Sequence, residues 1–123
     1  MLDFQNDELL GGMVAPFETV SVVVKSGAGV KLTRGSVLGV VSQEADGTYI
    51  VALVDSTKTD GSEKPFGVLA DVEVDATTEN KRATAYVTGE FNRAALKFGG
   101  TDTVTKHEQA LRNIGIITKR VVK

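Results

Sequence analysis

The sequence predicts a mainly β protein with one or two short helices. Several short segments are rich in β-branched residues and are bounded by turn signals, a pattern typical of strands. One later segment shows the 3.6-residue periodicity of a helix. With 123 residues, the chain has the length of a single domain. The expected strands are residues 17–25, 36–42, 48–54, 66–74, 82–88 and 116–122.

Turns and polar loops separate these strands. Ser26-Gly27-Ala28-Gly29 is expected to form a turn, and Asp46-Gly47 is a dipeptide typical of hairpins. Residues 55–65 and 75–80 are polar, so we expect both segments to lie on the surface.

The fourth expected strand has an acidic face. Because side chains alternate along a strand, the sequence places Asp71, Glu73 and Asp75 on one side, and Val72 and Val74 on the other.

Helical signals follow in the last third of the chain. Residues 91–98 suit a short helix or a helical turn. The next segment predicts a helix of about three turns. Its expected buried stripe consists of Val104, His107, Leu111 and Ile114.

Cap signals bound this second helix. Thr105 and Glu108 have the spacing of a capping box, which indicates a helix start. Gly115 stands where a C-terminal cap glycine is expected.

Composition excludes several classes of protein. The chain has no cysteine, so disulfides, thiolate zinc sites and cysteine nucleophiles are ruled out. No apolar run approaches the ~20 residues of a membrane span, and the N-terminus has no signal-peptide pattern. The formal net charge of -2 does not resemble the basic footprint of a nucleic-acid-binding protein.

The N-terminal segment differs from the rest. Residues 1–24 contain four acids and no lysine or arginine. Residues 1–16 are apolar in part but show neither strand nor helix periodicity, which favours an arm that binds another surface. We therefore divide the chain into an N-terminal arm, residues 1–16, and a β-rich domain, residues 17–123. The apolar residues of the arm are Leu2, Phe4, Leu9, Leu10, Met13 and Val14.

No set of residues predicts catalysis. His107 is the single histidine, and no nucleophile or orienting group accompanies it in the sequence. We expect it to be a helix-face or partly buried histidine. The sequence predicts no enzyme and no cofactor.

Binding motifs for small ligands are also weak. The acids at Asp71, Glu73 and Asp75, like Asp55 and Asp60 in a polar loop, lack the sharp turn and converging ligands of a calcium site. We therefore expect a solvated face and no metal.

Residues 26–31 resemble a phosphate loop only superficially, because they lack its Gly-Lys-Ser/Thr ending. The basic residues Lys119, Arg120 and Lys123 have no interleaved aromatic residues, so they are weak indicators of nucleic-acid binding.

Several motifs, taken in order, resemble the head decoration protein family of tailed phages. The resemblance runs from about Val20 to Ile117 and is weakest in residues 1–16. The stretch Gly-Glu-Phe-Asn-Arg-Ala-Ala-Leu is its most specific part. The motifs are Lys31–Gly39 (KLTRGSVLG), Phe66–Ala70 (FGVLA), Val74–Thr77 (VDAT), Ala85–Leu96 (AYVTGEFNRAAL) and Ala110–Ile116 (ALRNIGI).

The resemblance implies a compact β-barrel or β-tulip-like domain with an extended N-terminal arm. It implies a homotrimer that caps three-fold positions on the outside of the expanded phage head and stabilises it against DNA pressure. The implied partner is the major capsid protein, with no direct contact to nucleic acid or membrane. The implied location is the virion, after synthesis in the host cytoplasm. We expect the six apolar arm residues to bind the capsid.

Two other classes remain open at this point. The chain could be a different phage structural module, such as a tail or baseplate component. It could also be an enzyme accessory protein or small-molecule binder, which would need an apolar pocket that the sequence does not reveal.

Overall fold

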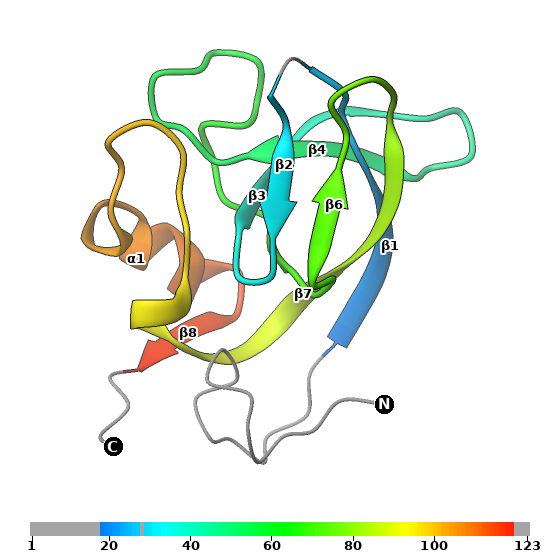
Figure 1. The fold of residues 1–123 in the computed structure, drawn as a ribbon. Helices are drawn as coiled ribbons and strands as arrows, with labels where there is room; N and C mark the ends of the chain where they lie inside the picture. Colours follow the sequence, from blue (N-terminus) through cyan, green and yellow to red (C-terminus); the bar gives the residue numbers. More distant parts are fainter. Residues whose placement is uncertain (1–17, 28, 120–123) are drawn as a thin grey trace.

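A computed structural model describes residues 18–27 and 29–119 (Figure 1). The described elements are β1 (Glu18–Val24), β2 (Lys31–Thr33), β3 (Val37–Gln43), β4 (Tyr49–Leu53), β5 (Gly67–Leu69), β6 (Glu73–Asp75), β7 (Lys81–Asn92), the 3-10 helix η2 (Arg93–Ala95), α1 (Val104–Asn113) and β8 (Ile116–Lys119).

Five strands close into a β-barrel. Their order is β1-β4-β3-β5-β7, and β7 pairs again with β1. The β1–β4 pairing is parallel, whereas the other pairings of the ring are antiparallel. Closure leaves the ring itself without an unpaired edge strand. The prediction of a mainly β, barrel-like domain with little helix is confirmed.

Two further elements extend the barrel. β8 pairs in parallel with the last residues of β7, where Gly89 lies opposite Ile116. β2 and β6 form a separate two-stranded antiparallel sheet that lies in front of the barrel in Figure 1. The buried side chains of Leu32 and Val74 attach this small sheet to the barrel interior.

The core has two apolar clusters. The first lies where η2, α1 and β8 meet the barrel, and the rings of Phe91 and Tyr86 are 5.5 Å apart within it. Its buried members are Val37, Val54, Val68, Tyr86, Phe91, Leu96, Leu111 and Ile116. The second joins the barrel to the small sheet through Val22, Val24, Leu32, Leu38, Val51, Leu69, Val74, Ala76, Ala83 and Ala85.

Most expected strands are present, but residues 66–74 do not form one strand. The segment divides into β5 and β6, which belong to different sheets. The interruption at residues 70–72 has a physical cause: the Asp71 carboxylate accepts a hydrogen bond from the Thr84 N–H, and the Val72 carbonyl accepts one from the Arg34 N–H. Val72 is therefore exposed rather than part of a buried valine face.

The region after β7 also differs from its prediction. β7 continues to Asn92, so Phe91 lies in a strand and is fully buried. Only Arg93–Ala95 is helical, and the Asn92 side chain accepts a hydrogen bond from the Ala94 N–H at its start. The expected helical turn within residues 91–98 is thus reduced to three residues.

Helix α1 is confirmed, but its expected start is wrong. It begins after Thr103, and that residue makes no side-chain cap bond. Thr105 and Glu108 lie inside the helix, and Glu108 accepts hydrogen bonds from Arg93 and from the Thr118 hydroxyl instead. These longer-range donors replace the expected capping box.

The other end of α1 agrees with the sequence in part. Gly115 has φ +94, the left-handed conformation expected of a cap glycine. His107 and Leu111 are buried, whereas Ile114 is exposed because it follows the last helical residue.

The long polar loop of residues 55–65 is only partly a surface loop. Its residues 57–60 are exposed, but Ser62 and Pro65 are buried. Gly61 explains the close packing here: its φ is +108, and a Cβ at this position would lie 2.3 Å from the Val40 carbonyl oxygen.

Candidate functional site

A buried polar cluster joins the 55–65 loop to the start of α1. The Asp102 carboxylate accepts hydrogen bonds from the N–H and the hydroxyl of Ser56, both at 2.7 Å. His107 Nε2 lies 2.7 Å from Asp102 Oδ2, the oxygen that also accepts the Ser56 N–H. The His107 ring stacks on Phe98 with a centroid distance of 5.2 Å. We call these four residues the Asp102 cluster.

The order of groups in the Asp102 cluster does not suit nucleophilic catalysis. In a catalytic triad, the histidine contacts the serine hydroxyl and removes its proton. Here the aspartate stands in the middle, and the Ser56 hydroxyl donates to the carboxylate. His107 lies on α1 as expected, but it is buried more completely than expected, since only 6% of its side chain is exposed.

The hydrogen bonds of the Asp102 cluster stabilise a charged carboxylate. The bond with His107, followed by those from Ser56, lowers the pKa of Asp102 to about 2. The carboxylate is almost completely shielded from solvent, so its donors satisfy it within the protein. The cluster is a structural tether between a loop and a helix that are distant in sequence.

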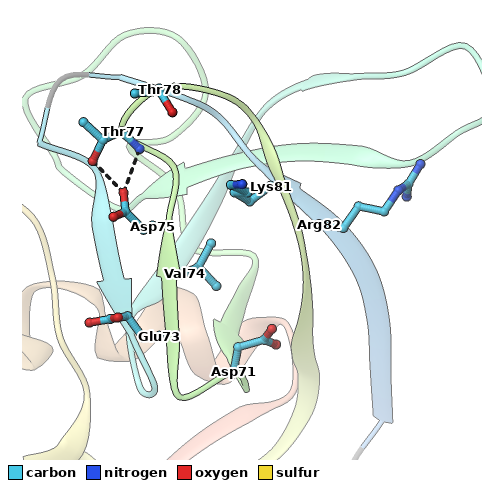
Figure 2. Close-up of a pocket in the computed structure, with 8 residues that line it drawn as sticks. All are labelled: Asp71, Glu73, Val74, Asp75, Thr77, Thr78, Lys81 and Arg82. Atoms are coloured by element: carbon cyan, nitrogen blue, oxygen red, sulfur yellow. Dashed lines mark hydrogen bonds between the residues drawn. The ribbon is translucent and has the colours of Figure 1, made fainter.

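A second polar region is an open groove between β6 and β7 (Figure 2). Its volume is about 660 Å³. Figure 2 shows the Val74 side chain between the two strands and the Asp75 carboxylate bonded to Thr77. We call it the β6–β7 groove; it is lined by Asp71, Glu73, Val74, Asp75, Thr77, Thr78, Lys81 and Arg82.

The acids of the β6–β7 groove already have partners. Glu73 forms an ion pair with Lys31 at 3.8 Å. The Thr77 hydroxyl and N–H donate to Asp75 and lower the pKa of its carboxyl group. Asp71 does not share a strand with the other two, because it accepts a bond from the Thr84 N–H in the interruption between β5 and β6.

The bases of the β6–β7 groove are paired as well. Lys81 lies 3.2 Å from Glu79, and Arg82 lies 4.0 Å from Glu44. Among residues 18–27 and 29–119, no three potential metal ligands converge here or elsewhere. The β6–β7 groove is a solvated, internally paired surface.

The remaining sequence motifs have structural positions. The Gly27 N–H donates to the Ala76 carbonyl, so the segment resembling a phosphate loop is tied to the small sheet. Lys119 forms an ion pair with Glu90 at 3.1 Å. Arg120 and Lys123 lie outside the described residues. No helix of the described chain is long and apolar enough to cross a membrane.

The expected capsid-binding residues all lie outside the described part of the chain. They are Leu2, Phe4, Leu9, Leu10, Met13 and Val14. The described chain begins at β1, whose residue Glu18 lies opposite Thr88 of β7. Residues 18–21 of β1 are exposed, and its last three residues are buried.

Sequence reasoning missed Asp102 and Phe98 as partners of His107, and it missed Ser56 as a donor to Asp102. Ser56 is 46 residues from Asp102, and no local pattern links the two. The one available signal is the position of His107 on the same helical stripe as Val104 and Leu111, because a buried imidazole needs a hydrogen-bond partner.

Comparison with known protein families gives a match over residues 3–117 to the bacteriophage lambda head decoration protein D family. No curated protein matches the chain. The matched family consists of structural proteins of the phage capsid and is not an enzyme family. The match includes the barrel, the Asp102 cluster and most of the N-terminal segment. The chain therefore belongs to the bacteriophage lambda head decoration protein D family and is a phage capsid decoration protein of the virion.

Proposed function

We propose that the protein forms homotrimers that bind the outside of the expanded phage head at its three-fold positions and stabilise the head against the pressure of packaged DNA. The observation that carries this proposal is the family match over residues 3–117. The proposed partner is the major capsid protein, and the proposed mode of action is mechanical reinforcement without direct contact to nucleic acid.

The barrel suits the role of a rigid reinforcing module. β1 contacts both β4 and β7, so the closed ring resists the opening of any single strand pair. α1 is held to η2 and β8 by Glu108, which accepts bonds from Arg93 and Thr118 at 2.8 and 2.9 Å. A domain fixed in this way transmits force between its contacts with little internal rearrangement.

We propose that residues 1–16 are the capsid-binding arm. Ordering a segment of this length costs backbone entropy that the burial of six apolar side chains does not offset alone. Backbone pairing with an exposed strand edge of the capsid would supply the additional stabilisation. The anchors in this proposal are Leu2, Phe4, Leu9, Leu10, Met13 and Val14.

Three arms in one trimer would bind more tightly than the sum of separate contacts suggests. Once one arm is bound, the other two are held near their sites at a high effective concentration. The start of β1 supports this arrangement, because residues 18–21 are exposed to solvent.

Removal of residues 2–14 tests the arm directly. The truncated protein is expected to remain folded and trimeric but to stay in the supernatant when expanded, undecorated heads are sedimented. The full chain is expected to sediment with the heads. Full decoration by the truncated protein would disprove the role of the arm.

The charge of the arm gives a second readout. Residues 1–16 contain Asp3, Asp7 and Glu8 and no base, so the receiving groove on the capsid is expected to be neutral or basic. Salt should therefore weaken head binding or leave it unchanged. Tighter binding at higher salt would contradict a basic receiving groove.

A further inference from the structure

Val72 is the most exposed large apolar side chain of the described residues. It is 80% exposed and lies in the interruption between β5 and β6. A single exposed valine is ordinary on a protein surface. Val72 is nevertheless a candidate for a contact with another protein chain, because its backbone is held by hydrogen bonds and a charged residue, Glu73, follows it.

The segment that carries Val72 is held rigidly from three directions. The Val72 carbonyl accepts a bond from the Arg34 N–H at 3.1 Å. The Ala70 carbonyl accepts one from the Arg34 guanidinium at 2.6 Å, and the Asp71 carboxylate accepts one from the Thr84 N–H at 2.9 Å. An apolar side chain presented on such a fixed backbone loses little conformational entropy on binding.

A second exposed apolar residue lies at the end of α1. Ile114 is 39% exposed, and Gly115 follows it in a left-handed conformation that fixes the turn into β8. Val72 and Ile114 differ in the charge beside them. Glu73 follows Val72 and is half exposed, whereas Arg112 precedes Ile114 by two residues and is exposed.

Arg112 is available for a partner outside the chain. No carboxylate of residues 18–27 or 29–119 lies within ion-pair distance of its guanidinium. Glu73 forms a long ion pair of 3.8 Å with Lys31, and the side chains of both residues are more than half exposed. Exposed pairs of this kind exchange partners at little cost.

We infer that Val72 and Glu73 of one copy contact Ile114 and Arg112 of the next copy in the trimer. This inference rests on the proposed trimeric function. In a three-membered ring, each copy uses two different surfaces. The first surface of one copy contacts the second surface of the next copy around the axis. The two segments carry opposite charges, and in each an exposed apolar residue lies within two positions of the charged residue in sequence.

Cysteine cross-linking tests the contact directly, because the natural chain contains no cysteine. The Val72→Cys/Ile114→Cys double variant is expected to give covalent dimers and trimers on oxidation. A matched control is Val20→Cys/Ile114→Cys, since Val20 is an exposed valine elsewhere in the barrel. The control should give no covalent trimer.

Charge reversal provides an independent readout. Glu73→Arg and Arg112→Glu are each expected to raise the trimer dissociation constant about fivefold at low salt, and the double variant should restore it. Sedimentation equilibrium measures these constants. Equal weakening by both single variants without restoration in the double variant would count against a direct pair.

The possible failures are distinguishable. If the unmodified chain is trimeric and decorates heads but the Val72→Cys/Ile114→Cys variant gives no covalent trimer, this contact is wrong and the proposed function stands. If Val72→Cys instead cross-links only to the capsid protein, the contact between copies is also overturned. If the unmodified chain is monomeric and does not bind heads, both the contact and the proposed function fail.

Discussion

Asp102 and His107 form a hydrogen-bonded pair with 2.7 Å between Oδ2 and Nε2 at the start of α1. The same carboxylate also receives two bonds from Ser56, so one buried group connects the 55–65 loop to the helix. This relationship explains why the single histidine of the chain is structural. It also makes a prediction about acid stability.

The protein should lose stability in acid as Asp102 takes up a proton. Its pKa is lowered from 3.8 to about 2 in the folded state, so the unfolded state binds more protons between these values. The stabilisation is therefore complete above about pH 4 and is lost as the pH falls toward 2. Urea denaturation across this range is expected to show a falling free energy of unfolding.

Asp102→Asn isolates the contribution of this carboxylate. The variant should be less stable at pH 7 and should show a smaller decrease below pH 4. It will not be insensitive to acid, because hydrogen bonds from Thr and Ser also lower the pKa values of four other aspartates, Asp46, Asp55, Asp60 and Asp75. An unchanged pH profile in the variant would contradict the assignment to Asp102.

Phe91 should be the most sensitive apolar position beneath α1. It is fully buried between the end of β7 and the helix, and its ring contacts Tyr86. Phe91→Ala is expected to destabilise the fold by about 3–5 kcal/mol because it leaves a cavity. Chemical denaturation measures this loss, and Phe91→Leu should cost less. A change below about 1 kcal/mol for the alanine variant would show that this cluster is not the main core.

Gly61 should tolerate no side chain. Its positive φ disfavours any other residue, and an added Cβ would also lie 2.3 Å from the Val40 carbonyl oxygen. Gly61→Ala is expected to cost more than the roughly 1–2 kcal/mol of the left-handed conformation alone. Gly29→Ala is the matched control, because Gly29 has φ +76 but no atom near its Cβ position. Equal losses of thermal stability in the two variants would contradict the steric argument.

Local patterns predicted much of this fold. β1 (Glu18–Val24) lies within the β-branched segment predicted at residues 17–25, and the Asp46-Gly47 turn connects β3 to β4. Gly115 ends α1 as expected, since a cap glycine is a local requirement. Features of this kind depend on neighbouring residues only, so a single sequence is sufficient to indicate them.

Features set by distant residues were not predicted. The small strand β2 has only three residues and is defined by its pairing with β6. The interruption between β5 and β6 depends on Arg34 and Thr84, which are far from it in sequence. Ser56 of the 55–65 loop, which donates to Asp102, is also distant from that residue in sequence. The motifs that indicated the family lie between about Val20 and Ile117. The residues expected to bind the capsid lie outside these motifs, in residues 1–16.

The most direct measurement is electron microscopy of the purified protein mixed with expanded, undecorated heads. The proposed function predicts additional density on the outer surface at the three-fold positions, with the shape of three barrels around one axis. Density at other positions, or heads that remain bare at saturating protein concentration, would contradict it.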